Sequence, residues 1–136
     1  LPPANPTWNH EVVRFGWHRS VYDVAPPDWF SNPFTSASQP SPSVDWWELP
    51  DFSSGDIKGV WELSRFNWVV AWATTAAHMD GLAIARLNAW LNDWSAQNPP
   101  YKGPNWKCGQ EASFRVIHLV MAVWILGQDD TPEPGM

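Results

Sequence analysis

The most regular pattern of apolar positions in the sequence begins near Asp56 and continues to about Ala77. Its members recur at spacings of three and four residues, which places them on one face of an α-helix. Polar residues at Ser54-Gly55-Asp56 are suited to cap the first turn. The pattern predicts one amphipathic helix whose apolar face consists of Val60, Leu63, Phe66, Val69, Val70 and Ala73.

A second amphipathic helix is predicted from Gly81 to about Ala96, with Asp80 as its cap. It ends before Asn98-Pro99-Pro100, because proline lacks the backbone N–H donor and restricts the residue that precedes it. Its apolar stripe has helical spacing and consists of Ile84, Leu87, Leu91 and Trp94.

A third helix is predicted after Gly103-Pro104, from residue 105 or 106 to about Leu126, with Gly127 at its end. From Val116 its residues are apolar on almost every side, which is typical of a helix surrounded by other elements. Two neighbouring helices give too little cover, so we infer that further helices come from the rest of a longer chain or from another chain. The apolar run is far shorter than the ~20 residues needed to span a bilayer.

The first fifty residues show no sustained helical period and hold most of the prolines. We expect one short helical turn there, between Asn9 and Phe15. The segment has too many aromatic residues for a disordered linker, so we expect extended chain that packs on the helices. The chain thus divides into an irregular segment (1–50), an all-α body of antiparallel helices (51–127) and an acidic, proline-containing tail (128–136). The aromatic residues of the first segment include Trp8, Trp17, Trp29, Phe30, Phe34, Trp46 and Trp47.

Composition and charge narrow the function. Twelve tryptophans are far more than an average chain carries, and their flat rings suit both a packed core and stacking on sugars. The net charge of −6 argues against a nucleic-acid partner, because phosphate contacts need a basic stripe and none is visible. An acidic polymer is repelled by the same charge, so its binding requires a locally basic groove. The single cysteine, Cys108, excludes an internal disulfide and is expected to be a buried, unreactive thiol.

Three segments of the sequence resemble the N-terminal region of heparinase II/III-type polysaccharide lyases. They follow the family patterns D-x-K-x-x-W-E-x-x-R, N-P-x-x-x-G-x-N-W and E-x-x-x-R, in that order, over roughly residues 45 to 127. The matching residues are the run from Asp56 to Arg65, then Asn98-Pro99, Gly103, Asn105 and Trp106, and finally Glu111 and Arg115.

The resemblance implies an incomplete (α/α) toroid followed, in the whole protein, by an antiparallel β-sandwich. It also implies β-elimination of uronic-acid-containing polysaccharides by a bacterial enzyme that is periplasmic or secreted. The family's catalytic Asn, Tyr and His begin at an Asn-Asn-His-type motif, which this sequence lacks, and its only tyrosines are Tyr22 and Tyr101. We therefore expect this chain to supply part of the substrate groove and not the main catalytic residues.

Seven residues are predicted to bind the glycan. Elimination requires the negative charge of the uronate carboxylate to be neutralised. The guanidinium of Arg115 and the side-chain amide of Asn105 are donors that could bind this carboxylate. Trp106 is a candidate platform for a sugar ring. The charged members are equally compatible with pairing along one helix, or with cross-links such as Glu62 to Arg115 or Glu111 to Arg65. The full set is Trp61, Glu62, Arg65, Asn105, Trp106, Glu111 and Arg115.

The histidines show no spacing typical of a metal site, and we expect neither a metal nor a cofactor. His118 lies within the apolar run, which favours a core histidine over a catalytic base, and His78 is expected at a helix end.

Two other functions are alternatives to a role as part of a polysaccharide lyase. One is a non-catalytic carbohydrate-binding or structural module in exopolysaccharide handling. The other is glycoside hydrolysis by Glu62 and Glu111, which requires the two carboxylates to face each other across a cleft at roughly 5–10 Å. That mechanism fails if each glutamate contacts an arginine and neither faces a cleft.

Overall fold

The computed structural model describes residues 11–14, 18–21, 25–32, 35, 43–52, 55–78 and 81–127. Most of these residues are helical, which agrees with the all-α class. The predicted caps Ser54 and Asp80, the side chains of His10 and Tyr22, and the tail 128–136 lie outside the described residues. The elements are β1 (Glu11–Arg14), β2 (His18–Val21), η2 (Trp46–Glu48), α1 (Lys58–Ser64), α2 (Asn67–Ala77), α3 (Gly81–Gln97), η3 (Pro104–Trp106) and α4 (Gly109–Ile125).

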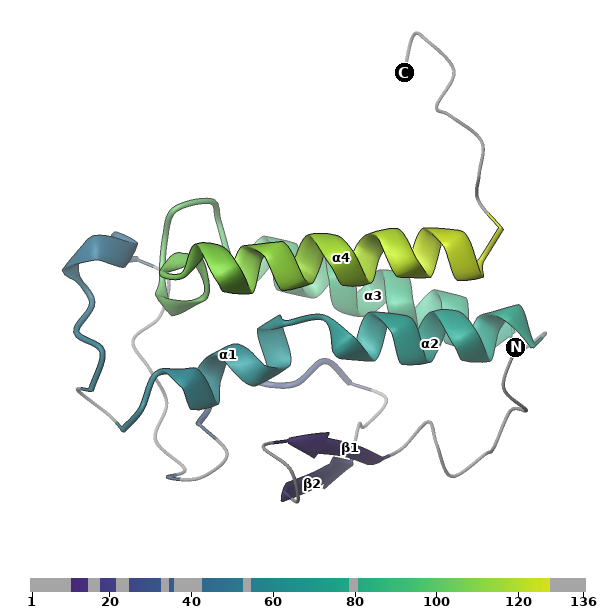
Figure 1. Cartoon of the computed structure of the whole chain (residues 1–136), viewed down its shortest axis with the longest axis horizontal. Coiled ribbons are helices and arrows are strands. Elements are labelled where there is room, and N and C mark those ends of the chain that lie inside the picture. Colours follow the sequence, from purple (N-terminus) through teal and green to yellow (C-terminus); the bar gives the residue numbers. More distant parts are fainter. Residues whose placement is uncertain are drawn as a thin grey trace, which may run out of the picture.

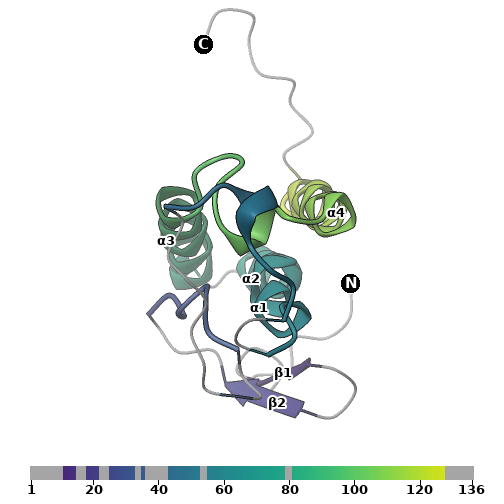
Figure 2. The ribbon, with the colours of Figure 1, turned by 90° about the vertical axis from the view of Figure 1, so that its left-hand side faces the viewer.

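The helix α2 lies between α3 and α4 and contacts both (Figures 1 and 2). The colours in Figure 1 show that the chain direction reverses from α2 to α3 and again from α3 to α4. Adjacent helices in sequence are therefore antiparallel, as predicted, while α2 and α4 run in the same direction. A groove of about 170 Å³ separates α3 from α4 and is lined by Val69, Ile84, Leu87, Asn88, Leu91, Leu119, Ala122, Val123 and Leu126.

The helix predicted from residue 56 to 77 is two helices, because the chain leaves the helical conformation at Phe66. Phe66 has φ 67°, in the left-handed region, and its ring is buried against the rings of Trp68 and Trp94. A side chain as bulky as phenylalanine rarely adopts this conformation, and here burial of its ring offsets the strain. The apolar spacing continues through the break, which is why periodicity alone predicted a single helix.

The break exposes the last carbonyl groups of α1, which have no partner within the helix. Side chains from other parts of the fold supply the missing donors. Each bond ties the end of α1 to α2 or α4: Trp68 Nε1 to the carbonyl of Leu63 (2.9 Å), Arg115 Nη1 to that of Ser64 (3.4 Å) and His118 Nδ1 to that of Arg65 (2.5 Å).

The core is built around tryptophans from three segments. Trp29 is fully buried, and its ring lies 5.7 Å from Trp68 and 6.0 Å from Trp90. Its Nε1 donates to Asp93 Oδ2 at 2.7 Å, which satisfies the one polar atom of the ring. Trp29 lies in the segment before the helices, so part of that segment belongs to the helical core.

A second contact of the same segment explains a glycine within α1. Asn32 is buried, and its Nδ2 donates to the carbonyl of Asp56 at 3.1 Å. A Cβ atom at Gly59 would lie only 2.6 Å from Asn32 Oδ1. Glycine weakens a helix interior, but here it allows residues 25–32 to approach α1 closely.

The N-terminal segment is less irregular than predicted. β1 and β2 form an antiparallel hairpin in which Glu11 pairs with Val21 and Arg14 with His18. The helical turn expected between residues 9 and 15 is wrong for residues 11–14, which are extended. The branched residues Val12 and Val13 favour a strand over a single helical turn.

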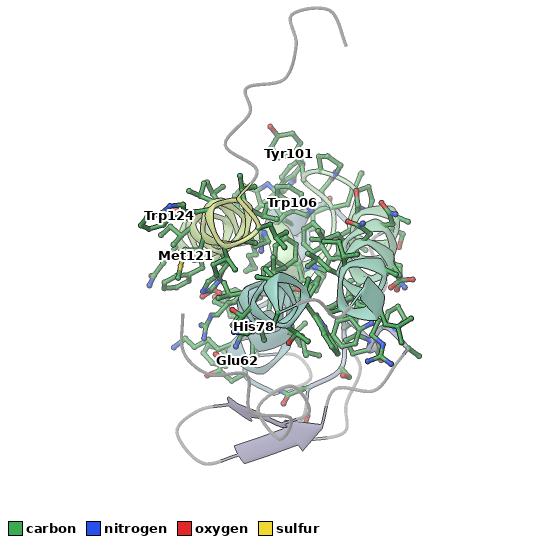
Figure 3. The ribbon with its side chains drawn as sticks, turned by 90° about the vertical axis from the view of Figure 1, so that its right-hand side faces the viewer. Glu62, His78, Tyr101, Trp106, Met121 and Trp124 are labelled. Carbon is green, nitrogen blue, oxygen red and sulfur yellow. The ribbon has the colours of Figure 1, made fainter. Side chains whose placement is uncertain are left out.

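The exposed face of α4 corrects a further expectation. Within the described residues α4 is not surrounded, because its apolar side chains lie largely open to solvent, and Figure 3 shows Met121 and Trp124 directed away from the other helices. None of the helices in the described part of the chain is both long enough and apolar enough to span a membrane. The exposed face consists of Val116, Ile117, Val120, Met121, Val123 and Trp124.

Candidate functional site

The three sequence motifs meet at one junction, formed by the end of α1, the turn η3 and the first half of α4. Trp61 Nε1 in α1 donates to the carbonyl of Pro104 in η3 at 2.8 Å. Arg115 Nη2 in α4 donates to the carbonyl of Asn105 at 2.9 Å. Residues more than forty positions apart in the sequence therefore form one connected structure, which we call the motif junction.

Arg65 holds the acidic side of the motif junction. Its Nε donates to Glu111 Oε2 at 2.6 Å and its Nη2 to Glu111 Oε1 at 2.9 Å, while Nη1 forms an ion pair with Glu62. The fork geometry gives Arg65 two parallel bonds to one carboxylate. The predicted cross-link between Glu111 and Arg65 is confirmed, as is the pairing of Glu62 with Arg65 one turn along α1. The alternative cross-link between Glu62 and Arg115 is not formed.

The pairing also argues against the hydrolase hypothesis. Glu62 and Glu111 are both buried and both bind Arg65. Neither lines the groove between α3 and α4. Two buried carboxylates that bind the same arginine are not placed as the acid and base of glycoside hydrolysis. The arginine contacts meet the first half of the criterion against hydrolysis, and for the groove that the described residues form the second half is met as well.

Arg115 forms the opposite side of the motif junction and is 5% exposed. Its guanidinium lies between two tryptophan rings, 5.1 Å from the centre of Trp94 and 5.2 Å from that of Trp106. Such stacking suits arginine, whose planar charge is weakly hydrated. Burial lowers the pKa of Arg115 from its usual value, while the nearby Glu111 and Cys108 act in the opposite direction. Arg115 donates to the carbonyls of Ser64 and Asn105. Its guanidinium therefore has a structural role: it joins the end of α1 to η3.

Asn105 is fully buried at the centre of the motif junction. Its Nδ2 donates to the carbonyl of Trp29 at 3.2 Å and to Asn98 Oδ1 at 2.9 Å, and both partners are acceptors that fix the orientation of the amide. Its Oδ1 is buried without a donor among the described residues. Asn105 thus links residues 25–32, the end of α3 and η3.

Replacing Asn105 by alanine is expected to lower the free energy of unfolding by about 1–3 kcal/mol, because the Trp29 carbonyl and Asn98 lose a buried donor. Urea unfolding followed by circular dichroism measures the change. Asn92→Ala, at an exposed position of α3, is the matched control and should have little effect. Equal stability of the two variants would show that the Asn105 amide does not hold the segments together.

Several side chains of the motif junction remain partly accessible, among them Trp61, Arg65, Trp106 and His118. Trp106 donates from Nε1 to the carbonyl of Asn98 at 3.0 Å, and its ring lies 6.1 Å from that of Tyr101. His118 was not predicted as a site residue. The Arg65 carbonyl can only accept a hydrogen bond, so Nδ1 of His118 must carry the proton that it donates. In the neutral imidazole, Nε2 is then unprotonated. His118 lies seven residues after Glu111, which places both on the same face of a helix. This spacing could have identified His118 as a neighbour of the site.

Other sequence-based expectations have mixed outcomes. His78 follows the end of α2, as predicted, with Nδ1 2.7 Å from the carbonyl of Thr74. Cys108 is a free thiol of intermediate burial and precedes the first residue of α4. Within the described ranges, no group of three or more His, Cys, Asp or Glu side chains is arranged to hold a metal ion.

Comparisons with protein-family models, curated proteins and solved structures found no match for this chain.

Proposed function

We propose that this chain is the N-terminal helical part of a heparinase II/III-type polysaccharide lyase, built as an incomplete (α/α) toroid. In this proposal the whole protein is periplasmic or secreted and cleaves a uronic-acid-containing glycan by β-elimination. The observation that carries the proposal is the motif junction. Three separate segments carry the family resemblance, and their residues bond to one another in space.

The geometry divides the seven predicted glycan-binding residues into two groups. Glu62, Asn105, Glu111 and Arg115 are buried and bound within the chain, so their role is to position the wall of the groove. Trp61, Arg65 and Trp106 are partly accessible and are the members of the set able to contact a glycan directly.

The charges of the motif junction are compatible with an acidic ligand. The carboxylates of Glu62 and Glu111 are balanced by the guanidinium groups of Arg65 and Arg115, so two negative and two positive charges cancel. The chain as a whole carries −6. Local neutrality removes the repulsion that a uronate would otherwise meet at this surface.

The exposed face of α4 supports a role within a larger helical body. Its side chains are all apolar and carry no charge, and contiguous apolar surfaces of this kind mark contact with other protein elements. In the proposed protein, further helices of the parent chain cover this face and complete more of the toroid.

A non-catalytic carbohydrate-binding or structural module is the second candidate, and the burial of Arg115 favours it. Arg115 is only 5% exposed, and both of its terminal nitrogens donate to backbone carbonyls, so its charge is directed into the fold and away from a substrate carboxylate at the surface. In this alternative the motif junction preserves a glycan-binding surface without chemistry.

An activity assay on the full-length protein that carries this segment separates the two candidates. With alginate and heparan sulfate as substrates, β-elimination produces an unsaturated uronate whose ultraviolet absorbance rises with each cleavage. We expect absorbance to rise with at least one acidic glycan and not with the same substrates and heat-denatured protein. Binding without any unsaturated product would establish the non-catalytic module and reject the lyase.

A further inference from the structure

Two highly exposed aromatic side chains come from segments that are distant in sequence and adjacent in space. Trp47 in η2 is 60% exposed, and Tyr101 in the turn after α3 is 68% exposed. The backbone N–H of Trp46 donates to the carbonyl of Tyr101 at 3.2 Å, and that of Gly103 donates to the carbonyl of Val44 at 2.9 Å. Figure 2 shows the blue η2 turn beside the green loop that follows α3.

The backbone at Tyr101 is strained, and burial does not account for it. Tyr101 and Phe66 are the non-glycine residues of the described chain with positive φ, both at 67°. At Phe66 the strain accompanies a buried ring, whereas at Tyr101 it presents an exposed ring to solvent, as Figure 3 shows. The positive φ of Tyr101 belongs to the turn that follows Pro100, which is closed by a hydrogen bond from the Lys102 N–H to the Pro99 carbonyl at 3.1 Å. Glycine or asparagine is the usual residue at this position of such a turn, so tyrosine here places a large ring at the surface where a small residue would serve the backbone better.

The surrounding side chains hold the exposed rings in place. The rings of Trp46 and Trp47 pack edge to face with their centres 5.7 Å apart, and the ring of Tyr101 packs against that of Trp106. Lys102 Nζ and Asp45 Oδ1 form a half-exposed ion pair at 2.6 Å across the same two segments. We call the rings of Trp46, Trp47 and Tyr101, with this ion pair, the aromatic platform.

We propose that the aromatic platform binds a pyranose ring of a glycan, which rests on the glycan role given to this chain above. Flat tryptophan and tyrosine rings suit the apolar C–H face of a sugar, and the rigid aromatic side chains lose little entropy on binding. The ammonium of Lys102 and the carboxylate of Asp45 supply a donor and an acceptor for sugar hydroxyls. The exposed face of α4 has no charged group, so it offers no comparable ion pair for sugar hydroxyls.

Isothermal titration of this chain with an alginate tetrasaccharide and with cellotetraose tests the proposal, and binding of either probe meets its first requirement. Trp47→Ala and Tyr101→Gly are each expected to weaken binding about tenfold, as for loss of one ring surface. Trp124→Ala is the matched control, since Trp124 is 78% exposed on α4 and outside the platform, and it should keep full affinity.

Tyr101→Gly also separates binding from folding. Glycine adopts a positive φ without strain, so the variant should unfold at the same temperature as the parent chain or higher while losing affinity. Failure of both probes to bind, full affinity in both platform variants, or an equal loss in Trp124→Ala would overturn the proposal. Lyase activity in the full-length protein is a separate result: it can be absent while the platform binds sugar, or present while the platform variants bind normally.

Discussion

Replacing Arg65 by methionine is expected to destabilise the folded chain by about 3–5 kcal/mol, because Glu62 and Glu111 lose the guanidinium that binds them both, and Arg115 alone cannot balance two buried carboxylates. Arg65 is the bonded partner of Glu111 and the ion-pair partner of Glu62. Methionine keeps much of the length of the side chain, so the loss reports on charge more than on packing. Urea unfolding of the 136-residue chain, followed by tryptophan fluorescence and circular dichroism, measures it.

Two further variants make the Arg65 result specific. Adding Glu62→Gln and Glu111→Gln to Arg65→Met removes both buried carboxylate charges and should recover part of the lost stability, while the charge of Arg115 stays buried. Arg86→Met is the matched control, because Arg86 stacks over Trp72 from α3 and takes no part in the motif junction. Its expected cost is about 0.5–1 kcal/mol. If the triple variant were no more stable than Arg65→Met, the loss would have to come from packing and not from unpaired charge.

The helices were predictable wherever local chemistry decides them. The end of α3 at Gln97 follows from the two prolines at 99 and 100, and the apolar stripe that includes Leu87 and Trp94 does face the core. The break at Phe66 was not predictable, because the apolar spacing crosses it unchanged. That break depends on Arg115 and His118, which lie some fifty positions further along and cap the carbonyls that it exposes.

The sequence predicted which residues form the candidate site, but it did not predict most of the hydrogen bonds and ion pairs between them. The resemblance selected residues that do meet, and the bond between Arg65 and Glu111 was one of the expected cross-links. Sequence spacing does not reveal which side of a helix is covered, so the burial of Asn105 and Arg115 was missed. The role of Trp94, which stacks on Arg115, was hidden because helical spacing already explained it as a core residue.

Replacing Trp29 by alanine is expected to cost about 3–5 kcal/mol, the usual range for removing a large aromatic side chain from a packed core. Trp29 is fully buried, contacts the rings of Trp68 and Trp90, and donates to Asp93. Its carbonyl also accepts from Asn105, so the residue lies between the aromatic core and the motif junction. Melting temperature and urea midpoint of the variant measure the effect.

The Trp29 result tests whether residues 25–32 fold with the helices or merely precede them. Trp29→Phe keeps most of the ring volume and loses the bond to Asp93, so its cost should be smaller, about 1 kcal/mol for the hydrogen bond beyond any packing change. Trp124→Ala removes an equally large but exposed ring and should change stability by less than about 0.5 kcal/mol. If Trp29→Ala behaved like Trp124→Ala, residues 25–32 would not belong to the core. The carbonyl of residue 29 would then not be held in place as an acceptor for Asn105. A large loss in Trp29→Ala alone instead means that residues 25–32 fold as part of the helical core, and the core then holds the backbone carbonyl of residue 29 where Asn105 donates to it.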